Sequence, residues 1–123
     1  MQPVNAIHGS ALVPESVHLG HGNFIDMGVK IGAGATVGNH TLLHAGAMVG
    51  TESSIADFVQ IGMGTIINAS VKIEEEAFIG SGVTIVSGVI IGKGARVGAG
   101  SVVVTSVKAG DTVFGNPAQV VKA

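Results

Sequence analysis

Three residues that could do chemistry share one spacing: His8, Asp26 and His44 lie 18 residues apart in the chain. An imidazole oriented by a carboxylate is the usual form of a general base. Imidazole and carboxylate groups also bind divalent metals. Because Asp, Asn and His are all favoured in turned backbone, the spacing is equally compatible with a structural role. Which of the three roles applies depends on the elements that position these residues.

A six-residue repeat sets those positions. Every sixth residue from Ile7 to Val103 is Ile, Leu or Val, seventeen in all. The residue two places earlier is mostly small or β-branched, with Asn23 as the exception, and the residue that follows is often Gly, Asp or Asn. These last types tolerate a left-handed or sharply turned backbone. A period of six fits neither a helix nor a hairpin and is the signature of hexapeptide β-helix repeats.

We therefore predict an all-β fold, a left-handed parallel β-helix of about six coils with no inserted loops. The handedness is favoured by the aliphatic-Gly form of the hexapeptide. Three hexapeptides close one coil, so residues 18 apart stack at about 4.8 Å, and His8, Asp26 and His44 share one corner. The expected organisation is a lead-in at 1–6, the β-helix at 7–104 and a C-terminal cap or tail at 105–123, because the repeat fails at Ala109.

Strand alternation predicts which side chains point outward from the three walls of the prism. Wall one presents Phe24, Leu42, Gln60, Phe78 and Arg96; wall two presents Leu12, Lys30, Met48, Ile66, Thr84 and Val102; wall three presents His18, Thr36, Ser54, Lys72 and Ile90. Large apolar groups gather on the first two walls, which is typical of a protein interface. We expect a homotrimer through walls one and two, chiefly through Phe24, Leu42, Phe78, Met48 and Ile66.

The composition excludes several classes of function. Charged residues make up 11% of the chain, the formal net charge is −2, and there is no Cys, Trp or Tyr. The lack of a basic run argues against nucleic acid as a partner, and the lack of Cys excludes disulfides and thiolate chemistry. With no long apolar run and no signal peptide, we expect a cytoplasmic protein without a membrane partner.

Four segments resemble a known family: Ile7-His8-Gly9-Ser10-Ala11, Ile79-Gly80-Ser81-Gly82, 97–103 and 115–122. They are similar to the hexapeptide-repeat acyltransferases that use acetyl-CoA, nearest the bacterial acetyltransferases of sialic acid and nucleotide-linked amino sugars. The resemblance implies acetyl transfer from acetyl-CoA to an amino or hydroxyl group of a small-molecule acceptor, possibly a sugar. It also implies a homotrimer, and contacts of CoA with Gly80, Gly82, Gly98 and Ala99.

The resemblance also locates two departures. The family's catalytic His, which precedes the segment matching 55–59, falls on Thr51, and a second His falls on Gln60. Threonine is not a base at neutral pH, so His44 with Asp26 becomes the first candidate, and His40 could join from a neighbouring chain. Two alternatives stay open. One is a non-catalytic trimeric scaffold; the other is a metal-binding protein similar to γ-class carbonic anhydrases that uses His8, Asp26 and His44.

Overall fold

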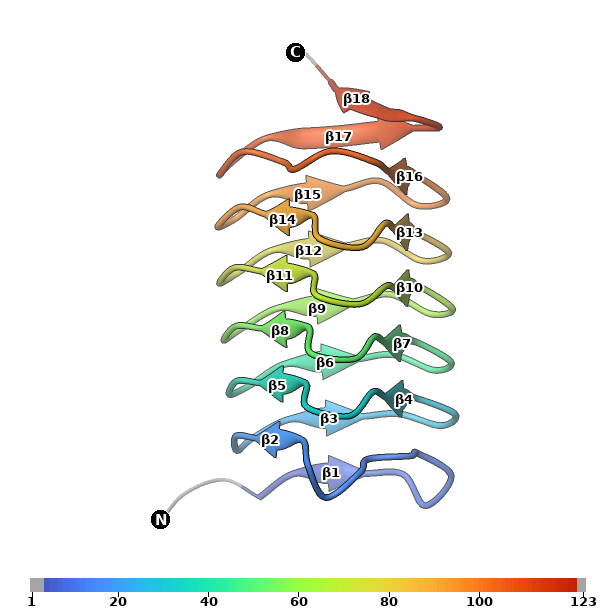
Figure 1. Cartoon of the computed structure of the whole chain (residues 1–123), viewed down its shortest axis with the longest axis vertical. Helices are drawn as coiled ribbons and strands as arrows, with labels where there is room; N and C mark the ends of the chain where they lie inside the picture. Colours follow the sequence, from blue (N-terminus) through green and yellow to red (C-terminus); the bar gives the residue numbers. More distant parts are fainter. Residues whose placement is uncertain (1–3, 122–123) are drawn as a thin grey trace.

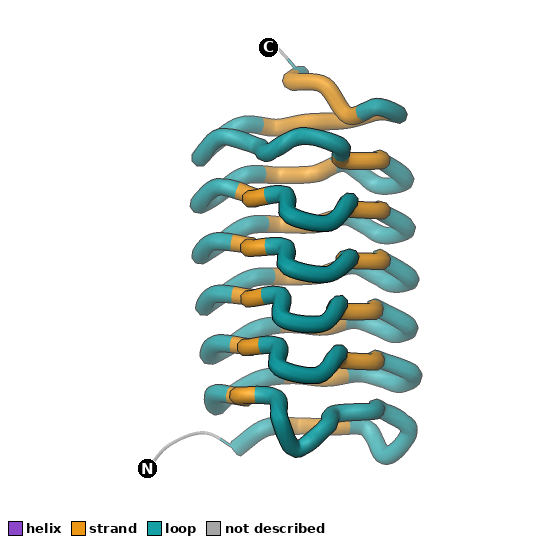
Figure 2. Tube along the Cα trace, viewed as in Figure 1, coloured by secondary structure: helices purple, strands orange, loops and turns teal. Residues whose placement is uncertain are grey.

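The computed structural model describes residues 4–121 and shows a three-walled prism built from stacked coils. The chain enters at one end of the prism and leaves at the other (Figure 1). Short strands alternate with corners of nearly constant length (Figure 2). Within the described residues the structure contains strands, turns and bends but no helix.

Each wall is one sheet whose strands come from successive coils. Wall one contains β1 (Ala6–Ile7), β3 (Phe24–Ile25), β6 (Leu42–Leu43), β9 (Gln60–Ile61), β12 (Phe78–Ile79), β15 (Arg96–Val97), β17 (Thr112–Gly115) and β18 (Ala118–Val120). Wall two contains β4 (Lys30–Ile31), β7 (Met48–Val49), β10 (Ile66–Ile67), β13 (Thr84–Ile85) and β16 (Val102–Val103). Wall three contains β2 (His18–Leu19), β5 (Thr36–Val37), β8 (Ser54–Ile55), β11 (Lys72–Ile73) and β14 (Ile90–Ile91).

The pairing register confirms the repeat. Parallel neighbours pair residues 18 apart, as in Ile7 with Ile25 and Ile25 with Leu43. The fold is therefore the left-handed parallel β-helix of about six coils that the hexapeptide pattern predicts. No corner from residue 25 to residue 103 carries an inserted loop.

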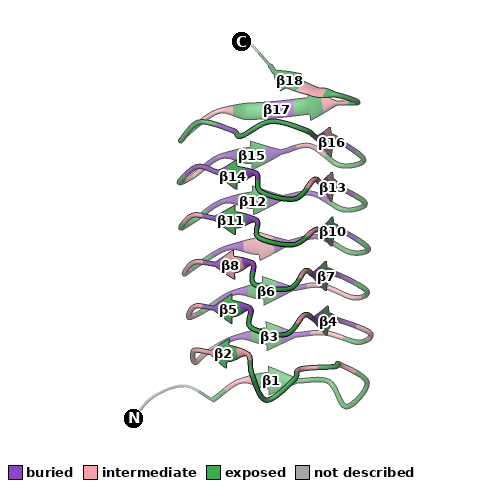
Figure 3. Ribbon diagram, in the orientation of Figure 1, coloured by how far each residue is buried: buried purple, intermediate pink, exposed green. Residues whose placement is uncertain are grey.

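The aliphatic position of each hexapeptide fills the core, and the residue before it faces outward (Figure 3). Ile25, Leu43, Ile61 and Ile79 are each 0% exposed, forming one column along the inside of wall one. Outside that wall, Phe24, Leu42 and Phe78 are 38–40% exposed. The predicted assignment of outward residues to walls is confirmed, including the apolar rows on walls one and two.

The glycine that follows many aliphatic residues has a different reason from the one we expected. The left-handed backbone lies two residues further on, for example at Gly28, Gly46 and Gly64, each with φ between 67° and 74°. Glycine directly after the aliphatic residue is required by close approach instead. A β-carbon at Gly62 would lie 2.5 Å from the carbonyl carbon of Gly80, one coil further along.

Asn23, the exception to the inward pattern, is buried and fully bonded. Its backbone N–H donates to Asn5 Oδ1 at 2.9 Å, and its amide nitrogen donates to the carbonyl of Gly38 at 2.9 Å. Its Oδ1 accepts from both the backbone N–H and the hydroxyl of Thr41, at 2.8 and 2.7 Å. A buried polar side chain is tolerated when its hydrogen bonds are made, so Asn23 joins neighbouring coils in place of an apolar residue.

Beyond residue 104 the chain continues the prism after a change of phase. Ile79 pairs with Val97, 18 residues on, whereas Val97 pairs with Val113, only 16 residues on. The coil has lost two residues between these walls, and the aliphatic positions reappear at Val107 and Val113, which are 6% and 4% exposed. β18 then folds back antiparallel on β17 and ends wall one. These residues give the predicted C-terminal cap its structure.

Candidate functional site

The prism has three columns of corners, which we number by the wall that precedes them. Corner one follows wall one and begins with residues 8–10, 26–28 and 44–46; corner two follows wall two and includes 50–52; corner three follows wall three and includes 20–22, 38–40 and 56–58. Each column repeats every coil. The candidate residues are therefore compared corner by corner.

The predicted stack of His8, Asp26 and His44 is confirmed for the backbone of corner one. The N–H of His8 donates to the carbonyl of Ile25, and the N–H groups of Asp26 and His44 donate in the same way to the following coil, at 2.9–3.0 Å.

The three side chains, however, turn to different partners. His8 Nδ1 lies 2.8 Å from Ser10 Oγ, and Asp26 Oδ1 accepts from the backbone N–H of Met27 at 2.6 Å. His44 Nε2 lies 3.1 Å from the side-chain nitrogen of Gln60. Among residues 4–121 of a single chain, no three His, Cys, Asp or Glu side chains are grouped to hold a metal. The column is therefore not a preformed ligand set within one chain.

His44 is the best supported of the three. It is half-buried, bonded to Gln60 on wall one, and packed edge-on against Phe24, with ring centroids 6.5 Å apart. Gln60 occupies the position of the family's second His, so the structure brings together two residues that the sequence singled out separately. Asp26 does not orient His44, because its carboxylate is bonded to Met27.

The predicted CoA contacts Gly80, Gly82, Gly98 and Ala99 also lie on corner one, in the two coils beyond Gly62. Close packing explains two of them, because a β-carbon at Gly80 would lie 2.7 Å from the N of Ala99, and one at Gly98 would lie 2.5 Å from the ring of Phe114. Gly82 has φ +67°, and a β-carbon there would meet open space. Structural needs thus account for these glycines without a ligand.

Thr51 and Glu52 lie at the outer edge of corner two. Both are exposed, and Glu52 has a left-handed backbone, with φ 59°. The position of the family's catalytic His therefore points away from His44 and corner one, with a hydroxyl and a carboxylate beside each other on a different edge of the prism.

Corner three contains an aromatic cluster that the sequence analysis missed. The rings of His40 and Phe58 are stacked, with centroids 5.3 Å apart and planes 15° apart. The ring of His21 packs edge-on against His40 at 5.7 Å and 86°. His40 and Phe58 both have left-handed backbone, with φ 56° and 60°. Such a backbone is rare for a bulky residue and is often found at functional sites.

Side chains of the same corner hold this cluster in place. Asn39 Oδ1 accepts from the N–H of His21 at 2.9 Å, and Asp57 Oδ1 accepts from the N–H of Asn39 at 2.8 Å. The ring of His40 also lies against Gly22, where a β-carbon would come within 2.5 Å of His40 Nδ1. The imidazole of His40 is exposed to solvent but restrained on several sides.

Two surface cavities lie away from these corners. One, of about 340 Å³, opens at the C-terminal cap between Val103, Val107, Val113 and Val120. The other, of about 380 Å³, lies on wall three between Ser54, Lys72, Glu74 and Lys93.

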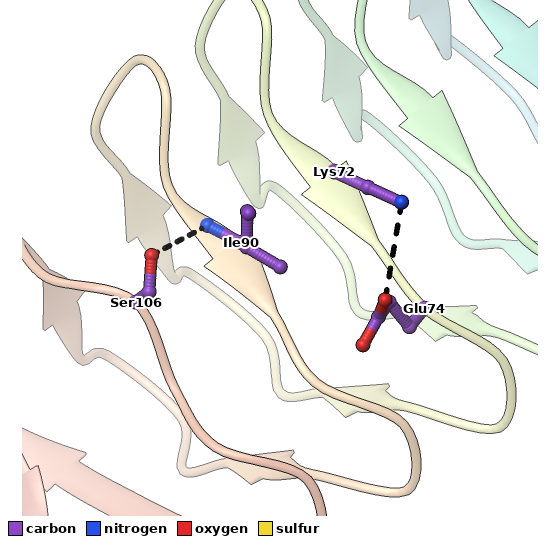
Figure 4. A network of polar contacts seen from close by, with 4 residues as sticks. All are labelled: Lys72, Glu74, Ile90 and Ser106. Atoms are coloured by element: carbon purple, nitrogen blue, oxygen red, sulfur yellow. Dashed lines mark hydrogen bonds and ion pairs between the residues drawn. The ribbon is translucent and has the colours of Figure 1, made fainter.

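The polar groups around both cavities have ordinary structural roles. Lys72 Nζ lies 4.0 Å from Glu74, and Ser106 Oγ accepts from the N–H of Ile90 at 3.0 Å (Figure 4). Exposed ion pairs of this kind contribute little and bind nothing by themselves.

Residues 4–121 include no helix with the length and apolar character to cross a bilayer.

Known proteins resemble the chain along most of its length. The family model described as bacterial transferase hexapeptide (six repeats) matches residues 16–51, 52–87 and 70–105. No curated protein sequence matches the chain.

Several solved structures are similar. A mutant of perosamine N-acetyltransferase from Caulobacter crescentus, in complex with CoA and GDP-perosamine, is 34% identical with a TM-score of 0.98, covering 99% of this chain and 58% of that one. The acetyltransferase domain of PglB from Neisseria gonorrhoeae, in complex with acetyl coenzyme A, is 30% identical with a TM-score of 0.94, covering 98% and 58%. A hexapeptide-repeat acetyltransferase from Vibrio cholerae, also with acetyl coenzyme A, is 26% identical with a TM-score of 0.78, covering 86% and 70%.

Proposed function

Because this chain belongs to the bacterial hexapeptide-repeat transferase family, we propose that it transfers an acetyl group from acetyl-CoA to a small acceptor. The acceptor class that the similar proteins suggest is a nucleotide-linked amino sugar, since one of them is described with CoA and GDP-perosamine. The chain spans 58% of the length of that protein. The acceptor and the activity are therefore taken as proposals to be tested on this chain itself.

The observation that carries this proposal is the near-complete superposition on an N-acetyltransferase that binds CoA, at a TM-score of 0.98. Likeness of fold alone does not establish function. Here it is supported by the sequence identity and by the uninterrupted hexapeptide pattern.

We also propose a homotrimer through walls one and two. The middle residues of corner one, which joins these walls, carry no charge: Gly9, Met27, Ala45, Met63, Ser81 and Ala99. Met27 and Met63 are 55% and 59% exposed in the single chain. The middle residues of corner three are all polar: His21, Asn39, Asp57, Glu75 and Lys93. Exposed apolar surface favours burial, so walls one and two with corner one form the better interface.

The site residues predicted from the sequence remain part of the proposal. His44, with Asp26, is one candidate for the group that accepts a proton from the acceptor, and Gly80, Gly82, Gly98 and Ala99 are the candidate contacts of CoA. All of them lie on corner one. They are tested below against a second location.

The test is a calorimetric titration with acetyl-CoA beside one with zinc. We expect saturable binding of acetyl-CoA at about one per subunit and a rise in the thermal midpoint, because a ligand that binds only the folded state stabilises it. Heat from zinc alone, lost in His44→Ala, would instead favour the metal-binding alternative. Silence with both ligands would favour the non-catalytic scaffold, to which the Thr51 replacement also points.

A further inference from the structure

The proposed trimer has a geometric consequence for the reacting centre. In a cyclic trimer, a corner that joins the two interface walls faces the three-fold axis. Corner one is that corner. Wall one of one copy then faces wall two of the next, and the groove between them opens outward between corner three of the first copy and corner two of the second.

Rotation about an axis parallel to the prism keeps each residue at its own height. Thr51 and Glu52 of corner two therefore lie at the level between two rungs of the neighbouring corner three, those of His40 and Phe58. One rung is about 5 Å from the next. The cluster of His21, His40 and Phe58 and the pair of Thr51 and Glu52 thus line opposite sides of one groove.

His40 has the properties that the Thr51 position lacks. Its imidazole can take up and release a proton near neutral pH, and its ring is restrained by the stack on Phe58 and the edge contact with His21. The left-handed backbone at His40 and Phe58 is the kind of local strain that persists at functional sites. By contrast, His44 would face the axis, away from the open groove.

We propose that His40 of one copy is the acid–base group of a site shared with Thr51 and Glu52 of its neighbour. This rests on the proposed function. The acceptor amine attacks the thioester carbonyl carbon of acetyl-CoA and forms the C–N bond. His40 takes the proton that the nitrogen loses, the C–S bond breaks, and the imidazolium returns the proton to the departing CoA thiolate. The products are the N-acetylated acceptor and CoA with its free thiol.

The shared groove can be tested without any activity. The chain has no Cys, so a double variant, His40→Cys with Glu52→Cys, carries thiols only at the two proposed edges. A bis-maleimide long enough to cross the groove is expected to join chains into covalent trimers, seen on a denaturing gel. Glu52→Cys alone is the control and is expected to give single chains. Single chains from the double variant would overturn the shared groove.

The role of His40 is tested by turnover of acetyl-CoA with GDP-perosamine, followed by release of the CoA thiol. Because glycine suits the left-handed backbone, His40→Gly is expected to fold. It should lose about 100-fold or more in kcat/KM, the contribution of a positioned base, and free imidazole should restore part of the loss. Glu76→Gly is the matched control, since Glu76 occupies the same position of corner three with φ 64°. Equal activity of the two variants would overturn the role of His40.

A second pair moves the imidazole without removing it. Gly22→Ala places a methyl group where the His40 ring lies, whereas Gly94→Ala, at φ +68° on the same corner, has open space. Both substitutions introduce the same backbone strain. We expect turnover to fall in Gly22→Ala only, and equal losses would overturn the requirement for the position of His40.

The proposed function and the role of His40 fail in different ways. Wild-type protein that neither binds nor consumes acetyl-CoA would overturn both. Active wild-type protein with an equally active His40→Gly variant would overturn the role of His40 and leave the proposed function standing.

Discussion

Corner one and corner three carry similar residues but use them differently. His8, Asp26 and His44 occupy equivalent positions of corner one, yet their side chains bond to three separate partners. His21, His40 and Phe58 of corner three form one stacked cluster. A shared period places backbones above one another but does not bring side chains together.

The difference lies in the left-handed position of each corner. On corner one that position is always glycine, at Gly28, Gly46, Gly64, Gly82 and Gly100. On corner three, three successive coils carry side chains there: His40, Phe58 and Glu76. Because glycine is the residue that this backbone favours, bulky residues at three such positions break a local rule. Such departures tend to mark function.

The largest expected effect concerns the polar column on the inner side of corner three. Asn23→Val replaces Asn23 with a residue that other coils accept, but it leaves the N–H and hydroxyl of Thr41 and the carbonyl of Gly38 without their partner. We expect the free energy of unfolding to fall by about 3 kcal/mol, since each orphaned buried group costs about 1–3 kcal/mol. Urea denaturation measures it. Thr41→Val, which removes one hydroxyl, should cost less; a larger loss there would contradict this role of Asn23 in the column.

An intermediate effect tests how tightly corner one is packed. Gly62→Ala adds a β-carbon 2.5 Å from backbone of the next coil, and overpacking of this kind costs about 2 kcal/mol. Gly64→Ala, at φ +67° in open space, should lose only about 1 kcal/mol from the left-handed backbone. Thermal unfolding of both variants gives the order. If Gly64→Ala is the less stable, backbone conformation rather than close approach dominates corner one.

The smallest effect compares one carboxylate from each corner. Asp57→Ala removes the acceptor for the N–H of Asn39 in the next coil and should cost about 1 kcal/mol. Asp26 accepts only from its neighbour Met27 at an exposed position, so Asp26→Ala should cost less than about 0.5 kcal/mol. Chemical denaturation distinguishes the two values. Equal costs would mean that corner three is no better braced than corner one.

Most of the fold could be predicted from the sequence because one period governs both strand and corner. The seventeen aliphatic positions predicted the coils, and the residues before them predicted the walls. The continuation at Val107 and Val113 could not be followed by the period, because two residues are missing from that coil. The same repeat in a new phase would have revealed it.

The candidate site was harder to predict for a physical reason. The stack of His8, Asp26 and His44 follows from spacing, whereas contacts depend on where each side chain turns. His40 and Phe58 could have been recognised as side chains at positions where corner one has glycine. That signal required knowing which corner residue is left-handed, and the structure supplies it.

The most direct test of the role of corner three compares His40→Asn with His44→Asn in one assay of acetyl-CoA and GDP-perosamine. Asn tolerates left-handed backbone, so both variants are expected to fold. We predict a loss in kcat/KM of about 100-fold or more for His40→Asn and a smaller loss for His44→Asn. The reverse order would place the reacting centre on corner one and contradict the assignment of His40.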